Sequence, residues 1–535
     1  MAAAPASSNL VASVRMYRAI LGDCFLLTLE QGEARTTILI DCGVLQGVTG
    51  ARERMKAVAD DIVRHCGGDP DSNVPGKLDL AVVTHEHADH ISGFGHGHEL
   101  LLNKDRLAIG ELWMAWTEKE GDEQADRLRE RFEKRKLAVT LAAQTASAGA
   151  PGRRLAAAPG WADLSVAQFI GEIDFGDDLA VAGTGETTRG PRTGRQIMQR
   201  LKEVAGTTRY FEPGTVTATP GGVNLRTYVL GPPRDEERLF HDLPSKGAAK
   251  ETYFAVRSLT EEAMIHFSSP DDPDNPEAEL HRSSPFARPH WALPASRVEG
   301  AAGLDEAGLD EADRAAALLH ARYFAKETHC RYAVSPPRAH DCDDDPVCRA
   351  PQEHRRIDGD WLAGAGAVAL KLDSDTNNTS LVLAFELPDK GILLFAADAQ
   401  VGNWLSWHDQ DYEADGEAVT ALDLLSRTIL YKVGHHCSHN ATLREQGLEA
   451  MTDPRLVAMI PVVEEVARKQ GRKGWNMPFP ELKHALLERT KGRLLRGDAP
   501  KGRDADGSVL TEDEDFLERV TEGPDGLWLE YRVTL

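Results

Sequence analysis

The chain has 535 residues, and its 61 Lys and Arg residues stand against 85 Asp and Glu residues, a formal net charge of −24. That charge argues against non-specific coating of nucleic acid or of an anionic membrane, and no stretch of the sequence approaches the ~20 apolar residues of a membrane span. Seven cysteines do not indicate a disulfide framework, and no secretory signal is visible, so the sequence predicts a reduced, cytoplasmic protein without a membrane partner.

The first hundred residues have the pattern of strands and turns around one helix. We expect strands over Val14–Ile20, Phe25–Leu29, Thr36–Ile40 and Leu78–Val83, and a helix over Ala51–His65. Strand, helix and strand with short connections are typical of an α/β protein.

The pattern changes after about residue 117. We expect a charged helix over Glu118–Ala148, a small-residue linker over Ala146–Gly160, and a strand over Val216–Leu230. Residues 234–365 read as an insertion with a Pro/Asp-rich loop, Ser268–Pro289, and a helix, Glu306–Lys326. Strands then follow at Ala367–Leu372, Ser380–Glu386, Gly391–Ala396, Leu456–Val463 and Leu527–Val533, with a helix at Phe479–Arg489.

The strongest chemical signal is the run His85-x-His87-x-Asp89-His90 at the end of a predicted strand. Alternate side chains on an extended backbone point the same way, so His85 and His87 can converge on one metal ion. A turn after His87 can direct Asp89 and His90 to a second position nearby. Imidazoles with a carboxylate suit zinc, and less exclusively manganese or iron.

This run resembles the HxHxDH signature of the metallo-β-lactamase superfamily. Asp41 resembles the early aspartate that braces the metal loop, Asp398 the aspartate that bridges both metals, and the segment 431–439 the last ligand motif, L-K-V-x-H-H-G-S in the ComEC-like branch. Three more features are similar to that branch: Gly22-Asp23-Cys24, Val229-Leu230-Gly231-Pro232-Pro233 and Asn377-Asn378-Thr379-Ser380-Leu381. The resemblance covers residues 12–116, 216–233 and 367–535.

The resemblance implies an α/β fold, the four-layer αββα metallo-β-lactamase sandwich, with large helical and loop insertions. Its first part would be residues 1–116 and its second part residues 366–535, with a core strand at 216–233. Residues 117–215 would form a helical insertion and linker, and residues 234–365 a partly mobile lid or docking arm for a partner protein.

The resemblance also implies the ligands of two zinc ions. His85 and His87 would hold one metal, while Asp89, His90 and His435 would hold the other, and Asp398 would bridge them. Asp89, His90 and Asp398 would be the catalytic residues. His435 is preferred over His436 because it comes first after the strand; His436, like Asp41, Asn378 and Lys432, would then support the ligands or contact the substrate. Many family members carry a further His on the first metal, and here either Asp375 replaces it or that site is weak.

Such a centre implies hydrolysis, because a bound zinc ion lowers the pKa of its water to about 7 and a metal-activated hydroxide becomes available at neutral pH. We expect a phosphodiesterase or nuclease acting on DNA or RNA, since the ComEC-like branch contains DNA-degrading members. The alternative is a hydrolase of a small ester, lactone or β-lactam. A third possibility is a partner-binding protein with a structural metal.

Substrate recognition is assigned to a basic run next to an aromatic residue: Arg468, Lys469, Arg472, Lys473 and Trp475. Basic side chains neutralise phosphates and Trp can stack on a base, although a solvated loop explains the run equally well. The insertion would fit a nuclease held inactive until needed, for example in phage defence. Within it His329, Cys330, His340, Cys342 and Cys348 lie close in sequence, but Cys342-x5-Cys348 is not a standard zinc-ligand pair.

Overall fold

The structure is a computed structural model, and it describes residues 10–45, 48–148, 193–241, 314, 317, 372, 374–470 and 474–533. For residues 137–148 only the backbone is described. The chain divides into two compact units, the first formed by residues 1–133, 163–255 and 370–535 and the second by residues 134–162 and 256–369. All elements below belong to the first unit, apart from the second half of α4.

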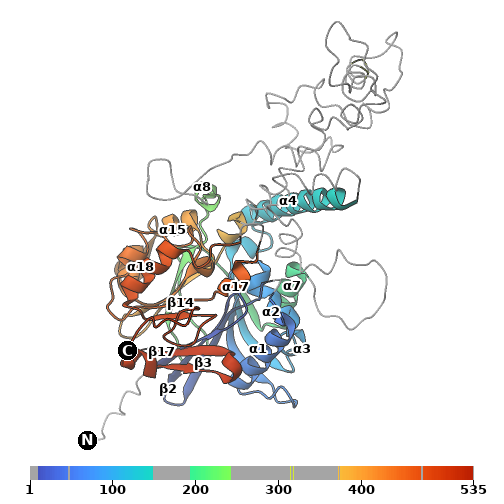
Figure 1. The fold of residues 1–535 in the computed structure, drawn as a ribbon. Coiled ribbons are helices and arrows are strands. Elements are labelled where there is room, and N and C mark those ends of the chain that lie inside the picture. Colours follow the sequence, from blue (N-terminus) through green and yellow to red (C-terminus); the bar gives the residue numbers. More distant parts are fainter. Residues whose placement is uncertain are drawn as a thin grey trace, which may run out of the picture. The chain divides into compact units, whose positions relative to one another are not determined.

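The first sheet is eight-stranded and mixed, with the order β16-β17-β1-β2-β3-β4-β5-β6 (Figure 1). Its strands are β1 (Val11–Tyr17), β2 (Cys24–Gln31), β3 (Ala34–Cys42), β4 (Gly76–Val82), β5 (Leu107–Ala115), β6 (Thr207–Phe211), β16 (Val520–Glu522) and β17 (Trp528–Arg532). Pairing is antiparallel from β16 to β3 and parallel from β3 to β6. Parallel strands need cover on both faces, which explains why the second half of β3 is fully buried.

The second sheet is seven-stranded and mixed, with the order β15-β14-β13-β10-β9-β8-β7. Its strands are β7 (Val216–Ala218), β8 (Arg226–Gly231), β9 (Val382–Glu386), β10 (Ile392–Phe395), β13 (Thr428–Lys432), β14 (Val457–Ile460) and β15 (Leu494–Arg496). The strands β10, β13, β14 and β15 run parallel, and β7 to β10 are antiparallel. A separate hairpin joins β11 (Asp411–Ala414) and β12 (Glu417–Thr420).

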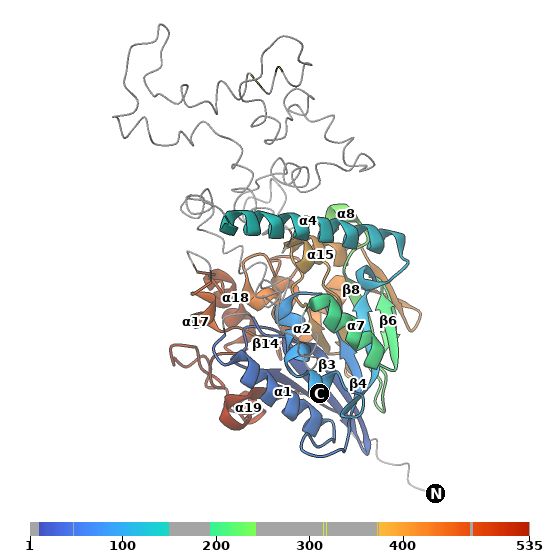
Figure 2. The same ribbon diagram turned by 90° about the vertical axis from the view of Figure 1, so that its right-hand side faces the viewer.

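The helices include α1 (Ala51–His65), α2 (Ala88–His96), α3 (His98–Leu101), α4 (Glu123–Ala148), α7 (Gly194–Val204), α8 (Glu236–Leu239), α15 (Val401–Trp407), α16 (Ala421–Ser426), α17 (Glu464–Ala467), α18 (Pro480–Thr490) and α19 (Glu514–Glu518), with 3-10 turns η1 (Trp116–Glu118), η5 (Gly434–Cys437), η6 (Leu448–Ala450) and η7 (Pro524–Gly526). Among the described helices, α1, α2 and α7 pack on the first sheet, and α15, α16 and α18 pack on the second. Figure 2 shows α1, α2 and α7 lying on the first sheet.

Three apolar clusters connect these layers. One joins the two sheets and includes Phe25 of β2 against Phe395 of β10, with ring centroids 5.9 Å apart. A second lies between the first sheet and α1, α2 and α7. A third lies between the second sheet and α15, α16 and α18. Burial of these apolar faces is the main stabilising contribution to such a fold.

The α/β prediction is confirmed, and several elements fall where they are expected. The helix Ala51–His65 is α1, and the expected helix and strand near the C-terminus are α18 and β17. The expected strand Val216–Leu230 is instead two strands, β7 and β8, because Pro220-Gly221-Gly222 turns the chain between them.

Other expectations differ or are not covered. Leu372 is helical rather than in a strand, and residues 146–148 extend α4 rather than a linker. The rest of the linker, the loop Ser268–Pro289, the remainder of the strand Ala367–Leu372 and the Cys/His group at 329–348 lie outside the described residues, as does the helix Glu306–Lys326 apart from residues 314 and 317, which are helical.

Candidate metal centre

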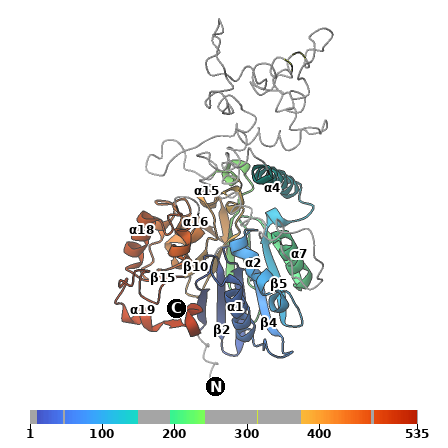
Figure 3. The same ribbon diagram turned by 45° about the vertical axis from the view of Figure 1, so that its right-hand side comes forward.

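The functional candidates lie where parallel strands end. Asp41 is at the end of β3, the histidine motif follows β4, Asp398 follows β10, and the segment 433–437 follows β13. Carboxyl ends of parallel strands meet at one edge of a sheet. The two sheets therefore bring these loops to a common edge, where Figure 3 shows the start of α2 beside the strands of the second sheet.

The histidine motif changes from extended chain to helix. His87 is the residue before α2, with an extended backbone (φ −64°, ψ 149°), and Asp89 and His90 occupy the first turn of that helix. His85, His87, Asp89 and His90 are all buried. The turn predicted after His87 is thus the start of a helix, and it brings the His90 ring beside His85, with ring centroids 4.1 Å apart.

Asp41 holds this loop in place. Its Oδ1 accepts the Thr84 N–H at 2.8 Å, and its Oδ2 accepts the Thr84 hydroxyl at 2.7 Å and lies 2.8 Å from His90 Nδ1. A carboxylate on Nδ1 fixes the ring so that Nε2 is the atom left for a metal. Asp41 therefore holds the segment that carries the histidine motif.

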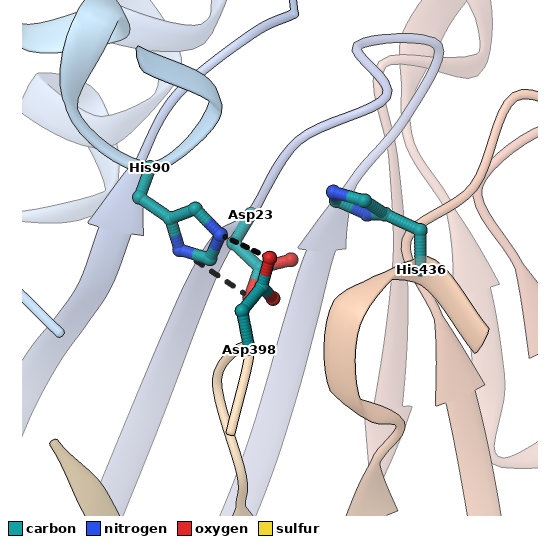
Figure 4. Close-up of side chains that lie close together, drawn as sticks. All are labelled: Asp23, His90, Asp398 and His436. Atoms are coloured by element: carbon teal, nitrogen blue, oxygen red, sulfur yellow. Dashed lines mark ion pairs between the residues drawn. The ribbon is translucent and has the colours of Figure 1, made fainter. Parts of the chain in front are cut away.

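Four buried side chains, one of them His90, converge at this edge. Ligand atoms of Asp23, His90, Asp398 and His436 all lie within 4.8 Å of one another. His90 Nε2 is 3.2 Å from Asp398 Oδ2, and Figure 4 shows Asp23 behind that pair and His436 facing it from the opposite side. In the described part of the chain, His90 Nε2 and Asp23 Oδ1 have no hydrogen-bond partner. Buried polar atoms left in this way are expected where an ion binds, so two imidazoles and two carboxylates fit a metal such as zinc.

His436, rather than the preferred His435, contributes its ring to this group. His436 Nδ1 lies 2.8 Å from the carbonyl oxygen of Pro461, and Nε2 lies 2.9 Å from Asp89 Oδ2. His435 instead donates its backbone N–H to Asp398 Oδ1 at 3.1 Å and to the Ala397 carbonyl at 3.1 Å. Both residues have a left-handed backbone, with φ of 41° and 50°.

His85 and His87 form a separate pair next to the group. His85 Nε2 lies 3.1 Å from His87 Nδ1, and His85 Nδ1 is 3.3 Å from the Ser380 hydroxyl. Burial lowers the pKa of both rings, His85 well below its usual value. They are therefore neutral at physiological pH, which is the form that binds metals.

The remaining predicted polar residues have defined places. Asn378 Oδ1 accepts the Gln400 N–H at 3.0 Å, and Nδ2 donates to the His241 carbonyl at 3.1 Å. Asp375 is buried in the helical turn 374–377 and is not one of the four converging residues. Both residues belong to the segment that leads into β9, and Asn378 stabilises the loop after Asp398.

Lys432 places an ammonium group inside the site. It is buried, pairs with Asp23 Oδ2, donates to the Ala397 carbonyl at 2.9 Å and lies 3.5 Å from Asp398 Oδ1. Burial acts to lower the pKa of Lys432, but Asp23 and Asp398 outweigh it and raise the pKa above its usual value. The ammonium therefore stays charged.

Asp398 and Asp89 are ionised as well, whereas burial outweighs the effect of Lys432 and raises the pKa of Asp23. Burial alone would favour the neutral acid, yet the rings of His90 and His435 hold the pKa of Asp398 well below its usual range. The pKa of Asp89 is lowered in the same way by His90 and His436, against the effect of burial. Burial acts to lower the pKa of His90 and of His436, but the carboxylates of Asp398 and Asp89 outweigh it and raise both pKa values, so these two rings would release a proton when a metal binds.

The predicted substrate-binding run has a different character. Lys469 Nζ pairs with Glu465 at 2.6 Å and Arg468 pairs with Glu464, both one helical turn away, and Trp475 donates its backbone N–H to the Ala467 carbonyl at 2.8 Å. Arg472 and Lys473 lie outside the described residues. Since acidic neighbours already neutralise Arg468 and Lys469, this segment offers less positive charge than its sequence implies.

Asp23 is the member of the converging group to which the sequence gave no role at the site, whereas His436 was expected to support the ligands or contact the substrate. Asp23 precedes β2 in the turn Gly22-Asp23-Cys24. The sequence analysis found this segment similar to the ComEC-like branch but did not predict that it binds a metal. The available signal was an acidic residue between a glycine and a buried strand. Lys432, the ion-pair partner of Asp23, lies in the second sheet and reaches Asp23 only because the two sheets pack together.

No helix in the described part of the chain is long and apolar enough to cross a membrane. Models of known protein families do not match the sequence, and neither does any curated protein.

Proposed function

We propose that this chain is a metal-dependent hydrolase with zinc at the edge shared by its two sheets. The observation that carries the proposal is the buried convergence of Asp23, His90, Asp398 and His436 from four separate segments. Burying imidazoles and carboxylates whose polar atoms are not fully hydrogen-bonded destabilises the folded state. A metal ion compensates that cost and supplies a reactive centre.

We infer that the fold is the four-layer αββα sandwich of the metallo-β-lactamase superfamily. Two observations support this: one apolar cluster joins the inner faces of the two sheets, and separate clusters join each outer face to helices. The six-residue motif from His85 to His90, followed by Asp398 and the adjacent histidines after β13, matches the order of that family's motifs.

The ligands of one zinc ion would be His90, Asp398 and His436, with Asp89 beside them; His85 and His87 would share Asp398 with a second. Manganese or iron suits the same donors. When bound, zinc acts as a Lewis acid that polarises an ester oxygen and activates water. The protein orients the donors: Asp41 fixes the His90 ring, and the Pro461 carbonyl fixes the His436 ring.

The favoured substrate is a phosphodiester of DNA or RNA, because the resemblance is to the ComEC-like branch. A cavity of about 310 Å³ beside Glu86 lies next to the metal motif and is lined by Arg129, Arg195 and Lys202 together with acidic residues. Because the cavity is lined by both basic and acidic side chains, it is also compatible with the alternative substrate, a small ester, lactone or β-lactam. The third reading is a structural metal in a partner-binding protein.

One experiment separates these readings. Metal content is measured first, and then wild type and Asp89→Ala are assayed against plasmid DNA, single-stranded DNA, RNA, a cyclic nucleotide, a lactone and a β-lactam. The matched control is Asp105→Ala, an exposed aspartate in a surface turn. We expect nucleic-acid cleavage that Asp89→Ala loses and Asp105→Ala keeps. Lactone or lactam turnover alone would support the rival substrate, and bound zinc without turnover would support the structural role.

A further inference from the structure

A buried lysine inside a metal-binding group requires a reason. Lys432 is the last residue of β13, and its side chain is 1% exposed. Leaving an ammonium buried without a partner is strongly unfavourable. Its partners are the Asp23 carboxylate, the Ala397 carbonyl at 2.9 Å and Asp398 Oδ1 at 3.5 Å.

Asp23 differs from the other three members of the group in what it already binds. Its Oδ2 pairs with the Lys432 ammonium and is 3.8 Å from His90 Nδ1, a nitrogen that bonds to Asp41 at 2.8 Å. His90, by contrast, turns Nε2 toward Asp398. Asp23 is thus the member whose Oδ2 is already paired with a cation of the protein itself, while its Oδ1 has no hydrogen-bond partner among the described residues.

The residue before Asp398 shows what the ammonium holds. Ala397 has φ 49°, a left-handed conformation that residues with a side chain adopt rarely. Its carbonyl accepts from Lys432 Nζ and from the His435 N–H at 3.1 Å. These two donors hold the strained turn that points Asp398 at His90.

We propose that Asp23 is the counter-ion of Lys432 rather than a metal ligand, and that Lys432 is a positioning residue for Asp398. The inference rests on the proposed metal centre and narrows it: His90, Asp398 and His436, with Asp89, hold the ion. Asp23 precedes β2 of the first sheet and Lys432 ends β13 of the second, so the pair also connects the two sheets at the site.

The test measures metal binding, without any need for turnover. Zinc affinity is determined by competition with a chromophoric chelator for wild type, Asp23→Asn and Lys432→Met, and the cobalt form of each gives a d–d absorption spectrum. We expect both variants to bind zinc about 10- to 100-fold more weakly, the range for residues that orient ligands. We expect the Asp23→Asn cobalt spectrum to keep the wild-type band positions, because its ligands are unchanged. Asp398→Asn is the positive control and should shift them.

The sign of the Lys432→Met effect is decisive. If the ammonium acted only by its charge, removing it would make the site more negative and zinc would bind more tightly; tighter or unchanged binding would overturn the positioning role. A shifted spectrum in Asp23→Asn would show that Asp23 is a ligand. Circular dichroism checks folding, and if Lys432→Met does not fold, the isosteric Asp23→Asn spectrum decides alone.

The outcomes also separate this inference from the proposed function. A wild-type protein that binds metal but hydrolyses nothing would contradict the hydrolase proposal. The zinc affinities and cobalt spectra of the variants would still decide the roles of Asp23 and Lys432. A wild-type protein that binds neither zinc nor cobalt would overturn both.

Discussion

Two neighbouring histidines show how one backbone conformation selects the ring that reaches the metal group. His435, His436 and Cys437 all have positive φ, at 41°, 50° and 67°. In this tight turn the His435 backbone N–H bonds to Asp398, and the His436 ring lies beside Asp89. The sequence order favoured His435 as the ligand. The left-handed backbone, which turns the His436 ring toward the converging group, could not be predicted from that order.

We expect His436→Ala to weaken zinc binding by about 100-fold or more, at or above the upper end of what supporting residues cost. His435→Ala is the matched control, one residue away: it keeps the backbone N–H that bonds to Asp398 and should lose less than about tenfold. Competition with a chelator measures both affinities. Equal losses would assign a ligand role to His435.

His65 makes stability depend on pH at a site remote from the metal motif. It ends α1, and its Nε2 lies 2.8 Å from the Thr28 hydroxyl. Burial, with the charges of Arg15 and Arg35, lowers the pKa of His65 to about 4. The unfolded chain takes up this proton near pH 6.5, so folding free energy is lost as pH falls from about 6.5 to about 4.

We expect His65→Gln to lose less stability over that pH range than wild type, by up to about 3 kcal/mol. Urea unfolding at pH 7.5 and pH 4.5 measures the difference. The control is His484→Gln on α18, where the side chain is 75% exposed. A His65→Gln protein with the wild-type pH dependence would contradict the prediction.

At the candidate site, the end of β3 and the start of α2 are in direct backbone contact. Gly43 follows β3, and a Cβ there would lie 2.0 Å from the Asp89 carbonyl carbon and 2.2 Å from the His90 nitrogen. The Gly43 N–H bonds to the Asp23 carbonyl, and the Asp23 N–H bonds to the Asp89 carbonyl, both at 2.9 Å. Close backbone contact thus ties the Asp23 turn, the end of β3 and the start of α2 together.

We expect Gly43→Ala to displace α2, to lower stability by about 1–3 kcal/mol or more, and to weaken zinc binding because Asp89 and His90 move. Gly67→Ala is the control. Gly67 has φ 80° with nothing near its Cβ position, so it should lose about 1–2 kcal/mol from backbone strain alone and keep zinc affinity. Denaturant unfolding and zinc competition measure both effects.

Elements with a clear one-sided pattern could be predicted, and those without it could not. In α1 the buried residues Met55, Val58, Ala59, Ile62 and Val63 recur at helical spacing, so the sequence located this helix to the residue. The strand β5, Leu107–Ala115, was not predicted, and neither was β6. In β6 only Phe211 is buried, and Gly110 and Glu111 interrupt the apolar run of β5, so neither segment has a regular alternation of apolar and polar residues.

For the molecule as a whole, a metal would connect the two sheets. His90 belongs to the α2 helix on the first sheet, whereas Asp398 and His436 follow strands of the second. We expect zinc at 100 times its dissociation constant to raise the free energy of unfolding by about 2.7 kcal/mol. Thermal unfolding with zinc and with a chelator measures this difference.

Loss of a ligand from either sheet should remove that stabilisation, so His90→Ala and His436→Ala should unfold at the same temperature with zinc and with chelator. Asp105→Ala, in a surface turn, should respond like wild type. A zinc effect that survives in both ligand variants would place the metal elsewhere.

The sequence by itself determined the α/β class, the helix α1 and the compact motif from His85 to His90, because residues this close express their chemistry through local spacing. Only the tertiary structure brought Asp23 to Lys432 and the His436 ring to Asp89, a pair separated by 347 positions. The physical reason is that side-chain direction in a left-handed turn and the meeting of two sheets depend on packing across the whole core. No local periodicity encodes either of them.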